Sequence, residues 1–333
     1  MIKKILLSHG SGGRLMHNLI KELILPRFSN PWLDRLSDSA VVNLGERKLA
    51  FTTDSFVVQP LFFRGGDIGK LAVSGTINDL VVAGAIPVYL SLSLIIEEGL
   101  DYASLVRIVD SISLASRRSK VKIITGDIKV VEKGACDKLF INTTGIGRSI
   151  RDYKVKDIKV GDKIIITGRI AEHGLSILSQ RKKIEFSIDV KSDCASLDNL
   201  LVPLIQKNKS IRFMRDPTRG GIATTLNEIA QAINLGLIIE ESKIPVANRI
   251  KAASELLGID PLYIANEGKA ILVVDSKSAR GILRYLNRHP QGRQAAIIGK
   301  VVAKPRGVVL LRTTLGTERI LDMLTYESLP RIC

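Results

Sequence analysis

Apolar residues in the first half of the chain recur with two different periods, which predicts alternating strands and helices. Short runs or strict alternation predict strands at residues 38–44, 48–53, 88–95, 121–125 and 138–146, and helical spacing predicts helices at residues 67–83 and 102–116. Gly84 and Pro87 break the apolar stretch 80–96, which is therefore expected to end a helix and begin a strand. Asp67 follows two glycines and is expected to cap its helix.

The second half repeats this style after a charged segment, residues 148–161, which lacks a sustained apolar period and is interpreted as an interdomain connection. Strands are predicted at residues 163–167, 237–240, 270–274 and 296–302, and helices near residues 197–205 and 222–233. We therefore predict an N-terminal domain of residues 1–150, a C-terminal α+β domain of residues 151–324 and a mobile tail of residues 325–333. Such a tail, fully extended, can carry its terminal group about 30 Å.

The composition of the 333 residues, 45% hydrophobic and 25% charged, is that of a folded globular protein, and the length suits two domains. The amino-terminal apolar run ends at Ser8, too early for a signal peptide. Residues 80–96 are shorter than the roughly 20 apolar residues that cross a bilayer. We therefore expect a cytoplasmic protein without a membrane partner.

Three cysteines, Cys136, Cys194 and Cys333, form no CxxC pair, which favours free thiols in a reducing compartment. Cys136 and Cys194 are interpreted as structural residues, because buried free cysteines are common. Cys333 ends a polar tail, where a core role is hard to arrange and an accessible thiol can be modified.

The formal net charge of +16 raises the question of nucleic-acid binding, because clustered lysines and arginines neutralise phosphates. The charges are scattered, however, and aromatic residues make up only 5% of the chain, so no nucleic-acid partner is expected. A basic surface also favours a substrate that carries phosphate.

The loop at residues 8–13 is rich in glycine and can present backbone N–H groups to an anion, although it matches neither the Walker A nor the dinucleotide-binding pattern. A nucleotide-binding role would involve His9, Gly10, Gly12 and Gly13. The alternative is an N-terminal loop without a ligand, followed by a helix that starts near Arg14.

Acidic side chains stand where a site for a metal and a nucleotide can form. Asp54 and Asp127 each end a predicted strand, and Asn78 and Asp79 interrupt an otherwise apolar helix. Mg²⁺ favours carboxylate and phosphate oxygens together, so converging aspartates would suit Mg-nucleotide binding. For any one of these residues, the alternative is a turn or a helix cap.

Residues 216–221, Asp-Pro-Thr-Arg-Gly-Gly, directly precede a predicted helix. A helix N-terminus flanked by glycines, with an arginine next to it, can seat a phosphate. The alternative is an ordinary helix start with Thr218 as its cap. The residues assigned to nucleotide binding in this region are Asp216, Arg219, Gly220, Gly221 and Asn227.

Two further titratable residues stand next to glycines or strand ends, where groups that transfer protons can be positioned: Lys129 and Glu267. The alternative for each is a solvated charge. His17, His173 and His289 have no partner at metal or triad spacing and are interpreted as structural or surface residues.

Four motifs occur together and in order: Thr-Asp-Ser-Phe-Val-Val at residues 53–58, Gly-Thr-Ile-Asn-Asp-Leu at 75–80, the motif at 216–221, and the terminal Pro-Arg-Ile-Cys at 330–333. With them the chain closely resembles the HypE family of nickel-iron hydrogenase maturation factors, from the glycine loop to the last residue. The resemblance implies a two-domain α+β fold like that of aminoimidazole ribonucleotide synthetase, whose N-terminal domain forms a homodimer through its strands.

The resemblance also implies an activity. In this family the partner HypF carbamoylates the terminal cysteine, the protein uses ATP to dehydrate the S-carboxamide to a thiocyanate, and the cyano group reaches iron on a HypC–HypD complex. By the same resemblance, Cys333 is the group carrier, and Lys129 and Glu267 are candidates for proton removal.

The resemblance assigns Asp54, Asp79 and Asp127 as ligands of Mg²⁺ bound with ATP. Two positions depart from the family pattern: Ile128 stands where a threonine is usual, and Tyr326 where a glycine is common.

Two other functions remain open at this stage. Phosphoryl transfer to a free small molecule, as in selenophosphate synthetase, would require a reactive cysteine or selenocysteine and a lysine in the glycine loop, and residues 8–13 have neither. A scaffold that docks its terminal peptide on a partner would consume no ATP and should tolerate Cys333→Ser.

Overall fold

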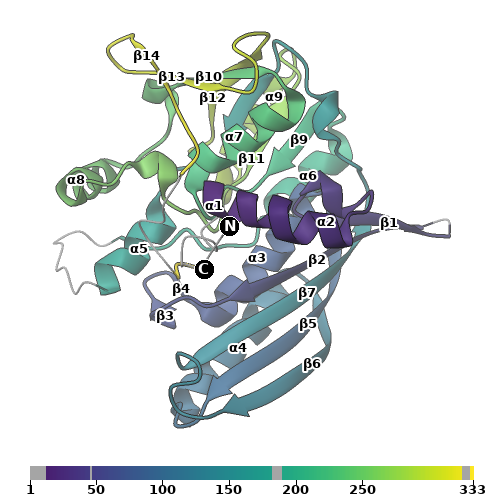
Figure 1. Cartoon of the computed structure of the whole chain (residues 1–333), viewed down its shortest axis with the longest axis vertical. Coiled ribbons are helices and arrows are strands. Elements are labelled where there is room, and N and C mark those ends of the chain that lie inside the picture. Colours follow the sequence, from purple (N-terminus) through teal and green to yellow (C-terminus); the bar gives the residue numbers. More distant parts are fainter. Residues whose placement is uncertain (1–12, 46, 182–189, 325–330) are drawn as a thin grey trace.

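The computed structural model describes residues 13–45, 47–181, 190–324 and 331–333. This part of the chain forms two lobes, each built on one sheet with helices packed against it (Figure 1). The N-terminal half of the chain contains α1 (Arg14–Leu19), the π-helix η2 (Ile20–Ile24), α2 (Leu25–Phe28), the 3-10 helix η3 (Leu33–Arg35), β1 (Ala40–Leu44), β2 (Arg47–Phe56), β3 (Phe62–Phe63), β4 (Gly66–Asp67), α3 (Ile68–Val82), β5 (Ala85–Glu97), α4 (Tyr102–Arg118), β6 (Lys122–Val131) and β7 (Leu139–Ser149). The elements from β1 to β7 form the N-terminal lobe, whereas α1 lies against the second lobe, where His17 contacts Glu228 (Figure 1).

The second lobe follows a connection that includes the 3-10 helix η4 (Val155–Asp157). It contains β8 (Lys163–Ile166), α5 (Glu172–Arg181), α6 (Asp198–Lys207), β9 (Ile211–Arg215), α7 (Gly221–Ile233), β10 (Gly236–Glu240), η5 (Glu241–Lys243), α8 (Asn248–Leu257), η6 (Pro261–Tyr263), β11 (Ile271–Val274), α9 (Ala279–Arg288), η7 (Pro290–Gly292), β12 (Ala296–Val302), β13 (Val309–Arg312) and β14 (Glu318–Ile320).

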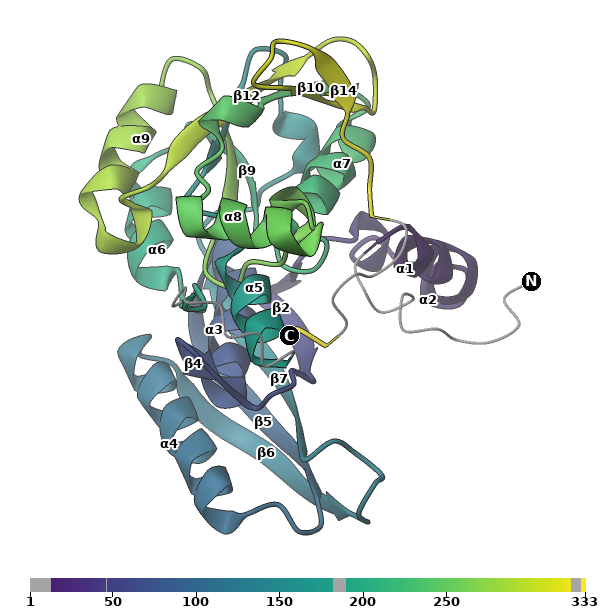
Figure 2. The same ribbon diagram turned by 90° about the vertical axis from the view of Figure 1, so that its left-hand side faces the viewer.

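The N-terminal sheet has the strand order β1-β2-β7-β5-β6, and its neighbours are antiparallel except for the parallel pair β5 and β6. Helix α3 packs on β2, β5 and β7, and α4 packs on α3, so both helices lie on the same side of the sheet (Figure 2). Side chains alternate between the faces of a strand, which turns Phe51, Tyr89 and Ile95 to the other face. These three side chains are exposed, so this outer face is open within the described part of the chain.

Helix α3 is buried almost all round, as expected for an apolar helix between a sheet and a second helix. The predicted cap is confirmed: the Asp67 carboxylate accepts hydrogen bonds from Gly69 N (2.8 Å) and Lys70 N (3.0 Å). Gly75 is required by close packing, because a Cβ there would lie 2.9 Å from the ring of Phe56. This packing fixes the position of Asp79 near the end of α3.

The C-terminal sheet has the order β14-β13-β10-β12-β8-β11-β9, and among its pairs only β10 and β13 are parallel within the described residues. Strands β8 and β11 lie inside this sheet, and residues 164–166 and 271–274 are fully buried. Burial on both faces explains why these strands read as continuous apolar runs without alternation.

The strands and helices predicted from the sequence are all present, with ends shifted by a few residues. β6 runs on to Val131, well past the predicted end at 125, because an edge strand exposed on both faces carries no apolar period. Helices α5, α8 and α9 and strands β9, β13 and β14 were not predicted, since short segments with mixed polarity give a weak periodic signal.

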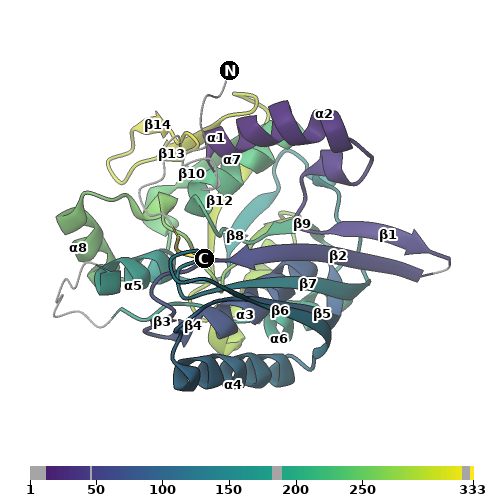
Figure 3. The same ribbon diagram turned by 60° about the horizontal axis from the view of Figure 1, so that its bottom comes forward.

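The end of the chain lies between the two lobes, beside the end of β2 and near α5 (Figure 3). Of the helices in the described residues, none is both long enough and apolar enough to span a bilayer.

Candidate active site

Four aspartates from both lobes form an acidic cluster where the lobes meet: Asp38 before β1, Asp54 on β2, Asp79 on α3 and Asp216 after β9. The Thr76 hydroxyl donates a hydrogen bond to Asp54 (3.1 Å), and the Thr52 hydroxyl donates to Asp79 (2.8 Å). Burial raises the pKa of Asp54 overall, although interaction with the Asp79 side chain lowers it. The packing of α3 on β2 therefore creates the cluster, since Thr52 and Asp54 alternate with outward-facing residues on the same strand.

Burial is the main reason that the acidic cluster holds protons tightly. It raises the pKa of Asp79 and of Asp216 well above the usual aspartate range, and the negative charges of neighbouring aspartates raise both further. Burial also raises the pKa of Asp38 to about 6, although the Arg215 guanidinium opposes the shift. Buried carboxylates that repel one another bind a cation in place of a proton when one is supplied.

The acidic cluster fits Mg²⁺ by its donor chemistry. Mg²⁺ takes one or two carboxylates together with substrate phosphates and water, and it seldom occupies a cage made of protein alone. Consistent with this, no three acidic, histidine or cysteine side chains among the described residues converge closely enough to enclose a metal ion. One or two carboxylates of the acidic cluster, with Asp54 and Asp79 as the candidates that interact directly, would hold the ion together with a nucleotide triphosphate.

Arg215 connects the acidic cluster to the first helices of the chain. Its Nε lies 3.0 Å from Asp38 Oδ1, its Nη1 lies 3.1 Å from Glu228 Oε2, and His17 Nε2 lies 2.7 Å from Glu228 Oε1. Asp38, Arg215 and Glu228 were not assigned from the sequence, and His17 was interpreted as a structural or surface residue. Only the fold brings residues so far apart in the chain into one network.

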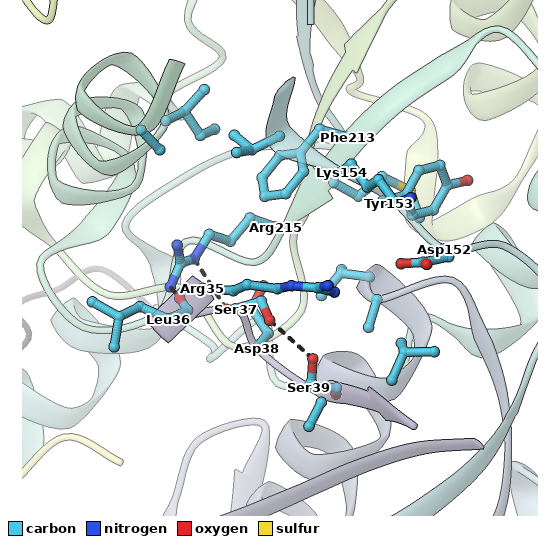
Figure 4. Close-up of a pocket in the computed structure, with 18 of the residues that line it drawn as sticks. Arg35, Leu36, Ser37, Asp38, Ser39, Asp152, Tyr153, Lys154, Phe213 and Arg215 are labelled. Atoms are coloured by element: carbon cyan, nitrogen blue, oxygen red, sulfur yellow. Dashed lines mark hydrogen bonds and ion pairs between the residues drawn. The ribbon is translucent and has the colours of Figure 1, made fainter. Parts of the chain in front are cut away.

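Asp38 and Arg215 also line a cavity of about 340 Å³ (Figure 4). Its other walls include the side chains of Trp32, Tyr153 and Phe213. This volume lies in the range of small-molecule pockets, and the aromatic walls with a charged rim can hold a flat heterocycle.

The glycine motif after Asp216 forms a turn that only glycine adopts readily. Gly220 and Gly221 have φ values of +77° and +61°, and a Cβ on Gly221 would lie 2.5 Å from the carbonyl oxygen of Leu262. The cap residue of α7 is Gly220, without a side-chain cap, so the alternative with Thr218 as the cap is wrong. The turn places Asp216 in the acidic cluster and Arg219 within electrostatic range of Asp54.

Glu267 is a further buried acid at the lobe boundary, outside the acidic cluster. It is 3% exposed, and its Oε1 has no hydrogen-bond partner within the described structure. Burial raises the pKa of Glu267 well above the usual glutamate range, and the charges of Asp216 and Asp193 raise it further. A carboxyl group in this state is suited to exchanging protons with a bound substrate.

Two asparagines assigned to nucleotide binding use their side chains inside the protein. Asn78 Nδ2 donates to Ala195 O (3.1 Å), and its Oδ1 accepts from Leu197 N (2.8 Å). Asn227 Nδ2 donates to Leu321 O (2.8 Å). Both join segments of the fold, and their contact with a nucleotide stays a prediction.

Asp127 and Lys129 lie away from the acidic cluster of their own chain. They form an ion pair of 2.8 Å on β6, with side chains 59% and 68% exposed. Asp127 pairs with Ser93 of β5 and therefore faces the outer side of the sheet, opposite to Asp54. Their roles in metal binding and proton transfer stay predictions.

The glycine loop is only partly within the described residues. His9, Gly10 and Gly12 lie outside them. Gly13 precedes α1, where a Cβ would lie 2.2 Å from Leu324 O, and Arg14 N donates to the same oxygen (2.8 Å). The start of α1 is therefore packed against the segment that leads to the terminal tail.

The last three residues are docked against the body of the protein. Val57 N donates to Cys333 O (3.1 Å), and Gln59 N donates to Arg331 O (3.3 Å), so the end of the chain runs beside the segment that follows β2. The Arg331 guanidinium pairs with Asp137 (2.6 Å). Ile332 is 5% exposed, and Cys333 is half-buried.

Sequence reasoning missed the residue that receives this end of the chain. His173, at the start of α5, is fully buried, and its Nε2 lies 2.5 Å from Ile332 O. Nothing in the local sequence marks it, because the partner is 159 residues away.

Comparison with known proteins agrees with this architecture. The family model for the N-terminal domain of AIR synthase related proteins matches residues 36–149, and the model for the C-terminal domain matches residues 159–312. The fold and the site define a two-domain protein of the AIR synthase-related class, and the predicted α+β fold is confirmed.

The relatives narrow this class. The chain is 48% identical to the carbamoyl dehydratase HypE of Bradyrhizobium diazoefficiens over 98% of its own length and 95% of the relative. It matches a crystal structure of hydrogenase maturation protein HypE in complex with ATP at 47% identity and a TM-score of 0.83, covering 99% of this chain and 100% of the other. A HypE–HypF complex matches with a TM-score of 0.87 at 42% identity, covering 92% and 99%. The chain belongs to the carbamoyl dehydratase HypE family.

Proposed function

We propose that this enzyme uses Mg-ATP to dehydrate the S-carboxamide on its own Cys333 to a thiocyanate, the source of the cyanide ligand of hydrogenase iron. The observation that carries the proposal is the docked chain end. Cys333 O accepts from Val57 N, three residues after Asp54 of the acidic cluster, a distance of about 10 Å along a strand. A terminal thiol held this close to a nucleotide site is placed for reaction, since proximity replaces a bimolecular step.

The chemistry follows from the poor leaving ability of an amide oxygen. Transfer of the γ-phosphoryl group of ATP to the carboxamide oxygen makes inorganic phosphate the leaving group, and loss of both nitrogen protons completes the carbon–nitrogen triple bond. The acidic cluster would hold the Mg²⁺ that neutralises charge on the phosphoryl oxygens. Glu267, whose raised pKa makes its ionised form a strong base, would accept one proton from nitrogen, and the departing phosphate would carry the other.

Partners follow from the same reaction. We propose that HypF carbamoylates Cys333, as suggested by the solved HypE–HypF complex of a relative, and that a HypC–HypD complex accepts the cyano group in the cytoplasm. Both exchanges require the chain end to leave its docked position, and residues 325–333 are long enough to carry it about 30 Å.

The test is the intact mass of the C-terminal peptide after incubation with HypF, carbamoyl phosphate and Mg-ATP. The expected result is a carbamoyl adduct on Cys333 that loses one water only when ATP is present. A carbamoyl adduct that stays unchanged with ATP would refute the dehydration, and no adduct at all despite active HypF would return the chain to the phosphoryl-transfer or scaffold functions.

We propose further that two copies pair through the outer face and free edge of the N-terminal sheet. The edge strand β6 is exposed over nearly all of its length, and its side chains Ile124, Ile128 and Val130 are 57%, 63% and 66% exposed. On the outer face, Phe51, Tyr89 and Ile95 are 47%, 40% and 41% exposed. A long exposed edge with apolar side chains is a pairing surface, and a second copy is its simplest partner. Pairing is the arrangement by which Asp127 and Lys129 of one chain would reach the acidic cluster of the other.

Replacing both Ile124 and Val130 with lysine is expected to convert the homodimer to a monomer, because two desolvated charges oppose burial of the edge. Dehydration should be lost with it. Sedimentation equilibrium gives the mass, and Leu256→Lys, on exposed helix α8, is the matched control. A double variant that is still dimeric, or a wild type that is monomeric at working concentration, would contradict this assembly.

A further inference from the structure

The buried imidazole of His173 is oriented by two contacts. Its Nε2 lies 2.5 Å from the carbonyl oxygen of Ile332, and its Nδ1 lies 2.7 Å from the Ser192 hydroxyl. A carbonyl oxygen only accepts, so Nε2 carries a hydrogen, and in the neutral ring Nδ1 accepts from Ser192. Burial lowers the pKa of His173, which favours this neutral form. The ring also packs edge-on against Phe63, with centroids 5.4 Å apart.

The segment that orients His173 also holds the backbone of Glu267. Asp193, next to Ser192, accepts a hydrogen bond from Glu267 N (3.1 Å), and Ala195 N donates to Glu267 O (3.3 Å). Asp193 is itself fixed by a buried ion pair with Lys269 (3.0 Å). Residues 192–195 therefore connect His173, which contacts the chain end, to Glu267, the candidate base, through a short stretch of backbone.

The other contacts of the chain end do not provide this link. Arg331 pairs with Asp137, whose side chain is 39% exposed, in the connection between β6 and β7. Val57 and Gln59 donate from the segment after β2. These contacts retain the tail on the N-terminal lobe. From the C-terminal lobe, the Arg181 guanidinium of α5 also donates to Arg331 O, but within the described structure only His173 joins the chain end to residues 192–195 and so to Glu267.

We propose that His173 is a positioning residue for the dehydration. It holds the Ile332 carbonyl on one side and is connected to Glu267 through residues 192–195 on the other, and it thereby places the carboxamide on Cys333 next to Glu267. This inference rests on the proposed function. A misplacement of about 1 Å at the reacting atoms costs on the order of 100-fold in rate, so a single hydrogen bond one residue from the reacting thiol can control the reaction.

The first experiment needs no catalysis. The unmodified protein is alkylated with iodoacetamide, and the labelling rate of Cys333 is read from the mass of its peptide in wild type, His173→Phe and His173→Gln. Phenylalanine keeps the ring packing but loses the donor, so alkylation is expected to be about fivefold to tenfold faster, the value of one hydrogen bond. Glutamine supplies an N–H at similar reach and is expected to stay near wild type. A wild-type labelling rate in His173→Phe would overturn the inference.

The second experiment measures the single-turnover rate of water loss from protein that HypF has already carbamoylated. For His173→Phe we expect a rate about 100-fold lower with an unchanged Kd for ATP, and recovery in His173→Gln. Ser192→Ala, which keeps the imidazole but frees its Nδ1, should lie between them and covers the case in which His173→Phe does not fold. Faster alkylation with an unchanged dehydration rate would overturn the positioning role. Absence of water loss in wild type would refute the proposed function instead, while the alkylation rates would still decide whether His173 docks the tail.

Discussion

Cys333→Ser is expected to abolish both the carbamoyl adduct and its dehydrated product, with no detectable modified peptide. A serine hydroxyl is not ionised at neutral pH, whereas a thiol supplies a thiolate nucleophile that can accept and carry the group. Mass spectrometry of the C-terminal peptide after incubation with HypF, carbamoyl phosphate and Mg-ATP measures the effect. ATP binding should be unchanged, because the substitution leaves the four aspartates of the acidic cluster in place.

The structure provides a way to separate chemistry from docking in this variant. The chain end is held through the backbone oxygens of residues 331–333 and through the Arg331 guanidinium, none of which serine alters. Resistance of the tail to carboxypeptidase should therefore match wild type. Cys136→Ser is the control for loss of a thiol elsewhere and should be modified normally on Cys333. A Cys333→Ser protein that still accumulates the product would refute Cys333 as the carrier.

Asp79→Asn is expected to lower the rate of dehydration at least about 100-fold and, without nucleotide, to make the protein more stable. The loss follows from removing a ligand of a metal whose charge stabilisation is worth several kcal/mol. The gain follows from the buried acidic cluster: the amide still accepts from Thr52, and because it is neutral without binding a proton, burying it avoids the cost that burial imposes on the Asp79 carboxyl group. A stabilisation of about 0.5–2 kcal/mol is typical when a functional site is relieved in this way.

Thermal unfolding with and without Mg-ATP measures both effects. The unfolding temperature of wild type should rise when Mg-ATP is added. Without nucleotide, Asp79→Asn should unfold at a higher temperature than wild type, and Mg-ATP should raise that temperature only slightly. Asp110→Asn, an exposed aspartate on α4, is the matched control and should leave rate and stability unchanged. An Asp79→Asn protein with a normal Mg-ATP shift would exclude Asp79 from the metal site.

The free energy of unfolding should also depend on pH through the acidic cluster. Asp38 has its pKa raised from 3.8 to about 6, so the folded state binds its proton more tightly than the unfolded state. Its contribution to stability is complete below the unfolded pKa and is lost as pH rises from 4 to about 6. This loss is the energetic reason that the nucleotide-free cluster would favour a bound cation at neutral pH.

The two lobes and their main elements could be predicted because apolar period and glycine position act locally. The strands at residues 163–167 and 270–274 are continuous apolar runs, and Asp67 stands directly before its helix, so each signal lies within the element that it forms. Short amphipathic helices such as α5 and α8 gave no comparable signal, and the exposed edge strand β6 was predicted too short for the same reason.

The sequence by itself determined the family, the overall fold and the identity of most candidate residues, because Asp54, Asp79, the motif at 216–221 and the terminal Pro-Arg-Ile-Cys stand in recognisable local patterns. Tertiary structure alone decided which of them meet. It joined Asp38 and Arg215 to the acidic cluster, turned Asp127 and Lys129 to the opposite face of the sheet, and placed His173 against the chain end. The physical reason is that contacts between residues more than 100 positions apart depend on strand pairing, helix packing and the meeting of two lobes, which no local pattern encodes.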